Sequence, residues 1–284
     1  PLVLRSCVTL KNRLIMAPMT VVLSFHDGIV TQEEIQHYGM RSKGLGAVIT
    51  GTANITDNGK GWPGELTIAT DDAIARLTEL SAAIHAGGAK SILQIFHAGR
   101  MTSEKTIGEQ PVSASSVAAE VPGSEIPREL SENEIEALIE AFGQATRRAI
   151  AAGFDGVEIH GANMYLLHQF FSPHSNRRTD HWGGSLEKRM NFPLAVIDRV
   201  AQEVAKTSRP FAIGYRLSPV EATVPGIRFE DTLAFVEQLK TKPLDYLHIS
   251  LKHFTRRANS QAYQEKSELA YIHEAVAGVM PVIG

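Results

Sequence analysis

The chain has 284 residues, of which 43% are hydrophobic and 21% charged, a composition typical of an ordinary globular protein with a substantial core. A net charge of −3 and the lack of a long basic run argue against a nucleic-acid-binding protein. The single cysteine, Cys7, excludes an intrachain disulfide and any zinc or iron–sulfur site made of cysteines alone within these residues.

Short apolar runs alternate along the chain with segments of helical periodicity. Helices are predicted where capping boxes at Thr31 and Ser131 open amphipathic segments, and where Asp71 or Asp72 precedes apolar residues at helical spacing. A further helix contains Pro193, which is expected to kink or delay it. This helix covers 186–204, and two more helical patterns cover 230–239 and 265–277. Strands are expected over 14–17, 47–50, 91–96, 156–160, 211–216, 246–250 and 281–283.

This alternation predicts a parallel sheet, either an open doubly wound sheet or a closed barrel. A nucleotide-binding open sheet would be expected to show a Gly-rich turn after an early strand, and none is present in the sequence. The polar residues Gln94, His160 and Arg216 end three different strands, which is where barrel enzymes collect catalytic groups. Long irregular segments over 98–128 and 161–185 fit active-site loops. The predicted fold class is therefore α/β, a (β/α)8 TIM barrel.

The strand count falls one short of a closed barrel. Only seven strand segments are found, and the seventh ends the chain at Gly284. A barrel without its eighth strand would leave two unpaired strand edges. We therefore expect residues 1–284 to form a single TIM-barrel domain that is C-terminally incomplete, from a natural protein longer than this chain.

The most specific segment runs from Val157 to Arg189 and reads VEIHGANMYLLHQFFSPHSNRRTDHWGGSLEKR. A strand ending in His-x-x-Asn, a Tyr two residues later and a downstream SPxSNxRTDxWGGS stretch resemble the signature of the Old Yellow Enzyme family. The similarity extends from Leu10 to the C-terminus. The resemblance implies an FMN-dependent oxidoreductase that takes hydride from NADH or NADPH. It would reduce the activated C=C bond of α,β-unsaturated carbonyl compounds, acting as an ene-reductase.

His160, Asn163 and Tyr165 suit the chemistry of that reaction. An ene-reductase must polarise a carbonyl, deliver hydride to the β-carbon and supply a proton to the α-carbon. His160 and Asn163 can both donate hydrogen bonds to one carbonyl oxygen, where negative charge develops. Tyr165 can supply the proton from the opposite face as a general acid. An isolated histidine at a strand end is more often structural, but this constellation favours a catalytic role.

The resemblance also implies flavin contacts from the first two strands. Ala17, Pro18, Met19 and Thr20 match a Pro-Met-[Thr/Cys] sequence that lies against the isoalloxazine in the family. The Thr hydroxyl would lie near the flavin C4 carbonyl and stabilise the electron-rich reduced ring. Thr52 lies where relatives place a backbone amide near the flavin edge.

Three residues at later strand ends complete the expected cofactor site. Gln94 matches a glutamine that hydrogen-bonds the pyrimidine part of the flavin, and His160 is expected to contact it too. Arg216 matches an arginine beside flavin N1 and O2, where a cation favours the anionic reduced ring. A buried arginine needs an anion, and either the flavin or the neighbouring Glu158 could supply one.

Two features depart from the family pattern. Val21-Val22-Leu23 follows Thr20 where some relatives carry a Tyr that helps to cover the substrate. Relatives hold the FMN phosphate with Gly-rich loops and an Arg after strands seven and eight, a region beyond Gly284. Larger iron–sulfur ene-reductases, such as dienoyl-CoA reductases, share the resemblance, and their cluster cysteines would also lie beyond this terminus.

Two other classes of function remain open at this point. One is a flavin-free barrel lyase or hydrolase with His160 as general base, for which Lys252 is the nearest Schiff-base candidate. The other is a non-catalytic fragment that binds a partner through open barrel edges. No metal is expected, because the spacing of the histidines places no pair at i, i+4 on a helix face, as judged from His160, His168, His174 and His181.

The expected partners are small molecules. The predicted substrate is an unsaturated carbonyl compound, with no nucleic acid and no membrane, and a homo-oligomer is possible in this class of protein. No apolar stretch is long enough to span a bilayer and the first residues do not read as a signal peptide. The expected location is therefore the cytoplasm.

Overall fold

A curled parallel sheet forms the centre of the molecule. The computed structural model describes residues 1–258 and 260–284. In this part of the chain seven strands pair in the order β3-β4-β6-β9-β10-β11-β12, and β5 pairs with β4 outside that path. The strands are β1 Leu2–Val3, β2 Thr9–Leu10, β3 Ile15–Met16, β4 Ala47–Asn54, β5 Leu66–Thr67, β6 Lys90–Phe96, β7 Val112–Ser113, β8 Arg128–Glu129, β9 Gly156–Gly161, β10 Ala212–Leu217, β11 Tyr246–Ile249 and β12 Val282–Ile283.

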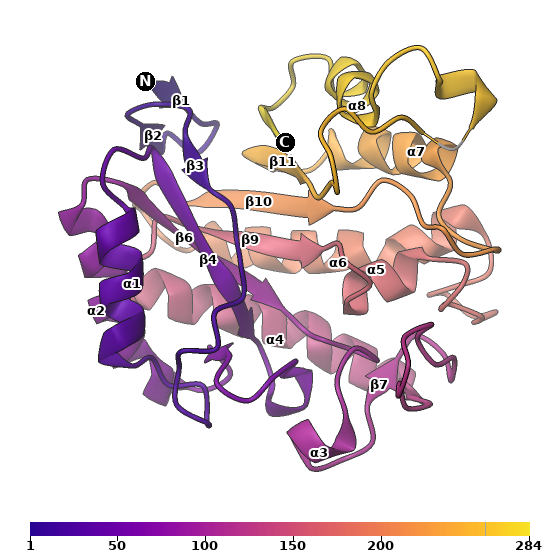
Figure 1. Cartoon of the computed structure of the whole chain (residues 1–284), viewed down its shortest axis with the longest axis horizontal. Helices are drawn as coiled ribbons and strands as arrows, with labels where there is room; N and C mark the ends of the chain where they lie inside the picture. Colours follow the sequence, from indigo (N-terminus) through magenta and orange to yellow (C-terminus); the bar gives the residue numbers. More distant parts are fainter. Residues whose placement is uncertain (259) are drawn as a thin grey trace.

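Helices pack on the outer side of this sheet. Figure 1 shows α4 and α6 lying behind the strands, and α5 lies beyond the arrowhead of β9. None of the helices in the described residues is long and apolar enough to cross a membrane. The helices are α1 Gln32–Arg41, α2 Ile74–Ala86, α3 Glu104–Ile107, α4 Glu132–Ala151, α5 Leu166–Phe171, α6 Leu186–Val204, α7 Phe229–Leu239 and α8 Glu268–Val276, with 3-10 turns η1 Asp57–Gly59, η2 Asp71–Ala73 and η3 Gln261–Tyr263.

The strand prediction is confirmed and the barrel prediction is confirmed in part. Each of the seven expected segments overlaps one strand of the main sheet, and all neighbours on its path run parallel. Within residues 1–258 and 260–284, β3 and β12 lie at opposite edges and do not pair with each other. The sheet is thus a partial, open barrel in which alternating strands and helices follow the (β/α) pattern.

The register of the strands determines which side chains lie next to one another on the inner face of the curled sheet. Gln94 is the partner of both Thr52 on β4 and Glu158 on β9. Two residues further along the strands, Arg216 is the partner of His160 and of His248. Because side chains of a strand alternate between its two faces, these two levels point to the same side of the sheet.

Two glycines make room for tyrosines of the next strand. A Cβ atom on Gly161 of β9 would collide with the ring of Tyr215, and one on Gly214 of β10 would collide with the ring of Tyr246. Both tyrosines are almost fully buried. Each ring therefore fills space that only a residue without a side chain leaves free.

The capping box predicted at Thr31 is wrong, and so is one of the two effects expected of Pro193, the delay of its helix. At Thr31 the side chain caps α1 by accepting from Glu34 N, but the Glu34 carboxylate accepts from Ser24 Oγ and does not complete a capping box. Pro193 does not delay its helix, since α6 begins at Leu186 and includes the proline. The capping box predicted at Ser131 is confirmed.

Candidate active site

The polar strand ends meet at one edge of the sheet, at the carboxyl ends of β6, β9, β10 and β11. We call this edge, with the residues that directly follow it, the rim. His160 and Arg216 are register partners there, and the ring of Tyr165 lies 5.0 Å from the ring of His160, measured between centroids. The structure therefore brings Arg216 close to His160 and Tyr165, although 56 positions separate it from His160 in the sequence.

His160 is buried, with 2% of its surface exposed. Burial, with the neighbouring charges of Arg216, His248 and His168, holds its pKa well below the usual value of 6.5. The imidazole is therefore neutral at pH 7. Its Nδ1 atom is buried and has no hydrogen-bond partner in the part of the chain that the structure describes.

Asn163 follows β9 in the left-handed conformation, with φ of 56°. Its Oδ1 atom accepts from Ser250 Oγ at 2.8 Å and from Ser218 Oγ at 3.3 Å, and its backbone N–H donates to Ser218 Oγ. Because both contacts use the amide oxygen, the Nδ2 atom remains as a donor on an exposed side chain. Ser218 and Ser250 follow β10 and β11, and the sequence analysis missed both.

Tyr165 lies among aromatic rings. Phe96 and Trp62 meet its ring edge-on, at centroid distances of 5.1 Å and 6.1 Å. Burial and the nearby Glu65 raise the pKa of Tyr165 to about 12, against the opposing field of Arg216. The phenol keeps its proton throughout the neutral range, as a general acid must before it reacts.

The segment from Ala17 to Thr20 crosses β4 at close range. A Cβ on Gly51 would lie 2.7 Å from the Met19 carbonyl oxygen, so this crossing requires a glycine. Pro18 is buried, whereas Ala17, Met19 and Thr20 are exposed. The hydroxyls of Thr20 and Thr52 lie 3.1 Å apart and are hydrogen-bonded. The two segments predicted to contact the flavin, 17–20 and the part of β4 around Thr52, therefore lie next to each other.

Gln94 and Glu158 form a buried pair behind the rim. Gln94 Nε2 donates to Glu158 Oε1 at 2.7 Å, and His248 Nδ1 lies 3.0 Å from Glu158 Oε2. Burial alone would raise the pKa of Glu158, but the charges and hydrogen bonds of His248, with Arg216 and Gln94, lower it overall. Glu158 is thus an anion inside the barrel, as considered from the sequence.

The charge of Arg216 is stabilised at a distance by Glu158, with no direct contact between the two side chains. Across the described residues it forms no ion pair within 4.0 Å, and its buried Nε atom has no hydrogen-bond partner. Burial lowers its pKa, and Glu158 acts in the opposite direction. The guanidinium therefore still has a donor free for another acceptor.

These free donors fit a flavin ring. Leaving a buried donor or acceptor unpaired costs about 1–3 kcal/mol, and the donor Arg216 Nε and the imidazole nitrogen His160 Nδ1 are both without partners in the described chain. A flat heterocycle that carries carbonyl oxygens and ring nitrogens could satisfy such groups from one slot. Thr20, Gln94 and Arg216 are the residues that would hold FMN, which supplies a reversible hydride acceptor when bound.

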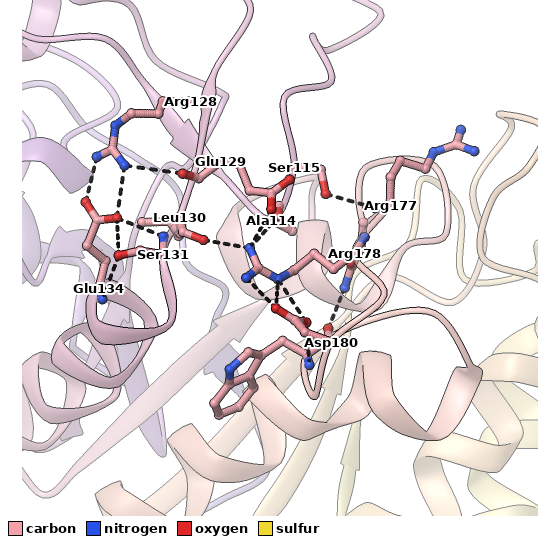
Figure 2. Close-up of polar contacts among 12 residues, drawn as sticks. Ala114, Ser115, Arg128, Glu129, Leu130, Ser131, Glu134, Arg177, Arg178 and Asp180 are labelled. Atoms are coloured by element: carbon pink, nitrogen blue, oxygen red, sulfur yellow. Dashed lines mark hydrogen bonds and ion pairs between the residues drawn. The ribbon is translucent and has the colours of Figure 1, made fainter.

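The loop after α5 has a different character. Arg178 donates to the carbonyl oxygens of Ala114 and Leu130, at 3.1 and 2.6 Å, and to Asp180 at 2.6 Å. Figure 2 shows this guanidinium surrounded by its acceptors, while Arg128 binds Glu134 nearby. Through these contacts Arg178 ties the loop after α5 to the segments at Ala114 and Leu130, so this part of the signature stretch acts as a hydrogen-bonded scaffold.

Comparison with known proteins gives the family. The model of the NADH:flavin oxidoreductase / NADH oxidase family matches residues 1–282. The chain belongs to this family. The FMN cofactor and the nicotinamide-dependent flavin oxidoreductase class predicted from the sequence are confirmed at the level of the family.

Three curated relatives show the extent of the match. NADH:acrylate oxidoreductase of Vibrio harveyi is 52% identical over 259 residues, 90% of this chain and 26% of that protein. NADH:fumarate oxidoreductase of Klebsiella pneumoniae (strain 342) is 49% identical over 255 residues, 88% and 27% respectively. The probable NADH-dependent flavin oxidoreductase YqiG of Bacillus subtilis (strain 168) is 44% identical over 284 residues, 100% and 76%. The chain thus spans about a quarter of the length of the first two relatives.

Solved structures confirm the kinship of the fold. The old yellow enzyme homologue from Zymomonas mobilis has a TM-score of 0.84 and 28% identity, over 96% of this chain and 77% of that one. Morphinone reductase has a TM-score of 0.78 and 30% identity, over 95% and 74%. The resemblance inferred from the 157–189 segment is therefore confirmed.

Proposed function

We propose that this protein is an FMN-dependent ene-reductase that takes hydride from NADH or NADPH and reduces activated C=C bonds of α,β-unsaturated carbonyl compounds. One observation carries the proposal. His160 and Asn163 offer free hydrogen-bonding groups at the same rim where Tyr165 keeps an acidic proton. These are the groups that such a reduction needs on the two sides of its substrate.

His160 and Asn163 would bind the carbonyl oxygen. A neutral imidazole can donate from one ring nitrogen, and the Asn163 amide is oriented by Ser250 so that its N–H groups remain available. Fixed donors of this kind stabilise negative charge on an oxygen because they need no reorganisation when that charge develops.

Tyr165 would supply the proton to the α-carbon. Its ring is held edge-on by Phe96 and Trp62, which restricts the phenol to one region of the rim. Exclusion of water by these rings helps to prevent exchange of the proton with solvent. Trp62 itself is partly exposed, with 38% of its surface accessible.

We further propose the cofactor contacts. Ala17, Pro18, Met19 and Thr20 would line one side of the flavin, with Thr52 beneath them. Since Gln94 donates its amide N–H to Glu158, its amide oxygen is the part left to accept from a flavin ring N–H. Arg216 would lie beside the most electron-rich part of the ring.

The names of two relatives support a small unsaturated acceptor. They are named for acrylate and fumarate, which are α,β-unsaturated carboxylates. A carboxylate next to the double bond presents an oxygen to the same donors as a ketone does. The single-domain organisation of residues 1–284 and any homo-oligomer remain predictions.

Absorption spectroscopy of the purified protein tests the proposal. We expect flavin bands that are bleached by NADH or NADPH under anaerobic conditions and recover on addition of cyclohexenone, acrylate or fumarate. Protein that stays colourless after addition of FMN would contradict it and favour the flavin-free lyase or hydrolase. Bleaching by NADH without recovery by any of the three acceptors would limit the function to NADH oxidation.

A further inference from the structure

Glu65 is a buried carboxylic acid that the reaction as described above does not use. It lies between η1 and β5, and none of its surface is exposed. Its Oε2 atom accepts from the backbone N–H of Gly61 at 2.7 Å. Its Oε1 atom is hydrogen-bonded to the hydroxyl of Thr52.

The contact with Thr52 continues to the surface through Thr20. Thr52 Oγ1 lies 3.1 Å from Thr20 Oγ1, and the exposure of the three side chains increases from Glu65 through Thr52 to Thr20. Glu65, Thr52 and Thr20 therefore form a chain of hydrogen bonds from the interior to the surface, which we call the relay. Its outer end is the hydroxyl that the family resemblance sets beside the flavin.

Counting protons shows that the state of Glu65 controls the direction of the relay. Each threonine hydroxyl has one proton to donate. If Glu65 is ionised, Thr52 must donate to it, so the bond between the threonines uses the proton of Thr20. If Glu65 is neutral, it can donate to Thr52, Thr52 can donate to Thr20, and the proton of Thr20 is free to point outward.

The surroundings favour the neutral acid. Burial raises the pKa of Glu65 to about 8, against the hydrogen bonds from Thr52 and Gly61 and the charge of Lys60. The titratable groups that interact with it are Lys60, on its own loop, and Tyr165. Tyr165 is neutral, and the charge of Lys60 opposes protonation of Glu65.

We propose that Glu65 is a positioning residue of the flavin site, which in its neutral form turns the Thr52–Thr20 relay outward so that Thr20 donates a hydrogen bond to the flavin. Ionisation of Glu65 reverses the relay and withdraws this donor. A donor at an oxygen of the ring stabilises its electron-rich reduced state, so the relay sets the reduction potential of the cofactor. The inference rests on the proposed function for the presence of flavin.

Infrared spectroscopy tests the state of Glu65 without using the flavin. At pH 7 wild-type protein should show the carbonyl stretch of a protonated carboxylic acid, and Glu65→Gln should lack it. Gln is the matched variant, because its amide can donate to Thr52 and accept from Gly61 as the neutral acid does. Identical carboxylic-acid bands in the two proteins would overturn the proposal, whether or not the protein binds FMN.

Flavin midpoint potentials then test the relay in protein loaded with FMN. In the wild type, the potential should fall by an additional step as the pH rises through about 8, and Glu65→Gln should abolish that step. Thr20→Val should lower the potential and also abolish the step. Adding Glu65→Gln to Thr20→Val should then change nothing further.

The double variant separates the relay from a simple field effect. If Glu65→Gln removes a pH-dependent step equally well in the Thr20→Val background, the charge of Glu65 acts through space and the relay is wrong. Thr52→Val provides a second break in the relay with Glu65 in place, and persistence of the step in that variant would also contradict the proposal. Failure of wild-type protein to bind FMN would instead refute the proposed function.

Discussion

Two arginines, one in the loop after α5 and one on β10, show how differently the protein treats polar groups. Arg178, in the loop after α5, donates from all three of its nitrogens to Asp180, Ala114 and Leu130. Arg216, at the rim, has a buried Nε without a hydrogen-bond partner within the described chain. The two residues are equally conspicuous in the sequence, yet one is internally satisfied and the other is not.

The difference separates scaffold from site. A buried polar group whose partners all belong to the protein gains nothing from a ligand, and it fixes the loops that it joins. A buried donor without a partner is costly in the free protein, and a ligand that supplies the acceptor recovers that cost. At the rim, His160 Nδ1 and Arg216 Nε are unpaired among the described residues and belong to register partners, so one bound molecule could reach both.

The largest expected effect is on the rim. Tyr165→Phe should slow reoxidation of the reduced enzyme by cyclohexenone about 10²–10⁴-fold, since it removes the general acid. The ring and its contacts with Phe96 and Trp62 are kept, so stability should change little. Stopped-flow measurement of the two half-reactions checks this, with reduction by NADH as the internal control. An equal loss in both half-reactions would contradict the role given to Tyr165.

A change in the scaffold should act on stability instead. Arg178→Met should lower the free energy of unfolding by about 3 kcal/mol, chiefly because two buried carbonyl oxygens lose their donor. Asp180 is 44% exposed, so water replaces much of its contact. The matched control is Arg128→Met, which breaks the exposed pair with Glu134 and should cost less than about 1 kcal/mol. Urea unfolding of both variants measures the difference. Similar losses of unfolding free energy in the two variants would contradict the scaffold role of Arg178.

Arg216→Met should affect the binding of FMN more than the stability of the protein, the reverse of Arg178→Met. We expect FMN to bind about 10–100-fold more weakly, because the variant loses one or two charge-assisted hydrogen bonds to the flavin. The unfolding free energy of the flavin-free protein should fall by less than in Arg178→Met, since Arg216 has no direct ion pair to lose in the described chain. Fluorescence titration with FMN gives the affinity. Arg216→Lys, which keeps the charge, should recover part of the binding.

The smallest effect concerns acid stability. Because the pKa of His160 lies well below 6.5 in the folded protein, the unfolded chain binds a proton there at pH 5.5 that the folded protein does not. The contribution of His160 to stability is therefore lost as the pH falls below 6.5, by about 1 kcal/mol at pH 5.5. His160→Gln should remove this loss when urea unfolding is compared at pH 5.5 and 7. The exposed His26→Gln should not.

Periodic and local features of this protein could be predicted from its sequence. The seven strands followed from apolar runs, and the polar residues that end β6, β9 and β10 indicated the rim. The orientation of Asn163 could not be predicted, because Ser218 and Ser250 reach it from two other strands. The same holds for Glu65, whose partner Thr52 lies 13 residues away along an intervening loop. No local pattern encodes contacts of this kind.

The paired glycines and tyrosines bear on how β9, β10 and β11 find their alignment. Alternation of apolar and polar residues forbids a slip of one residue between neighbouring strands, but a slip of two keeps every side chain on its own face. The space left by Gly161 and Gly214 removes that ambiguity. A displaced Tyr215 or Tyr246 would meet a side chain where each ring now lies against a glycine. Correct threading of these strands, and with it the pairing of Arg216 beside His160, is thus secured by two residues that take no part in the chemistry.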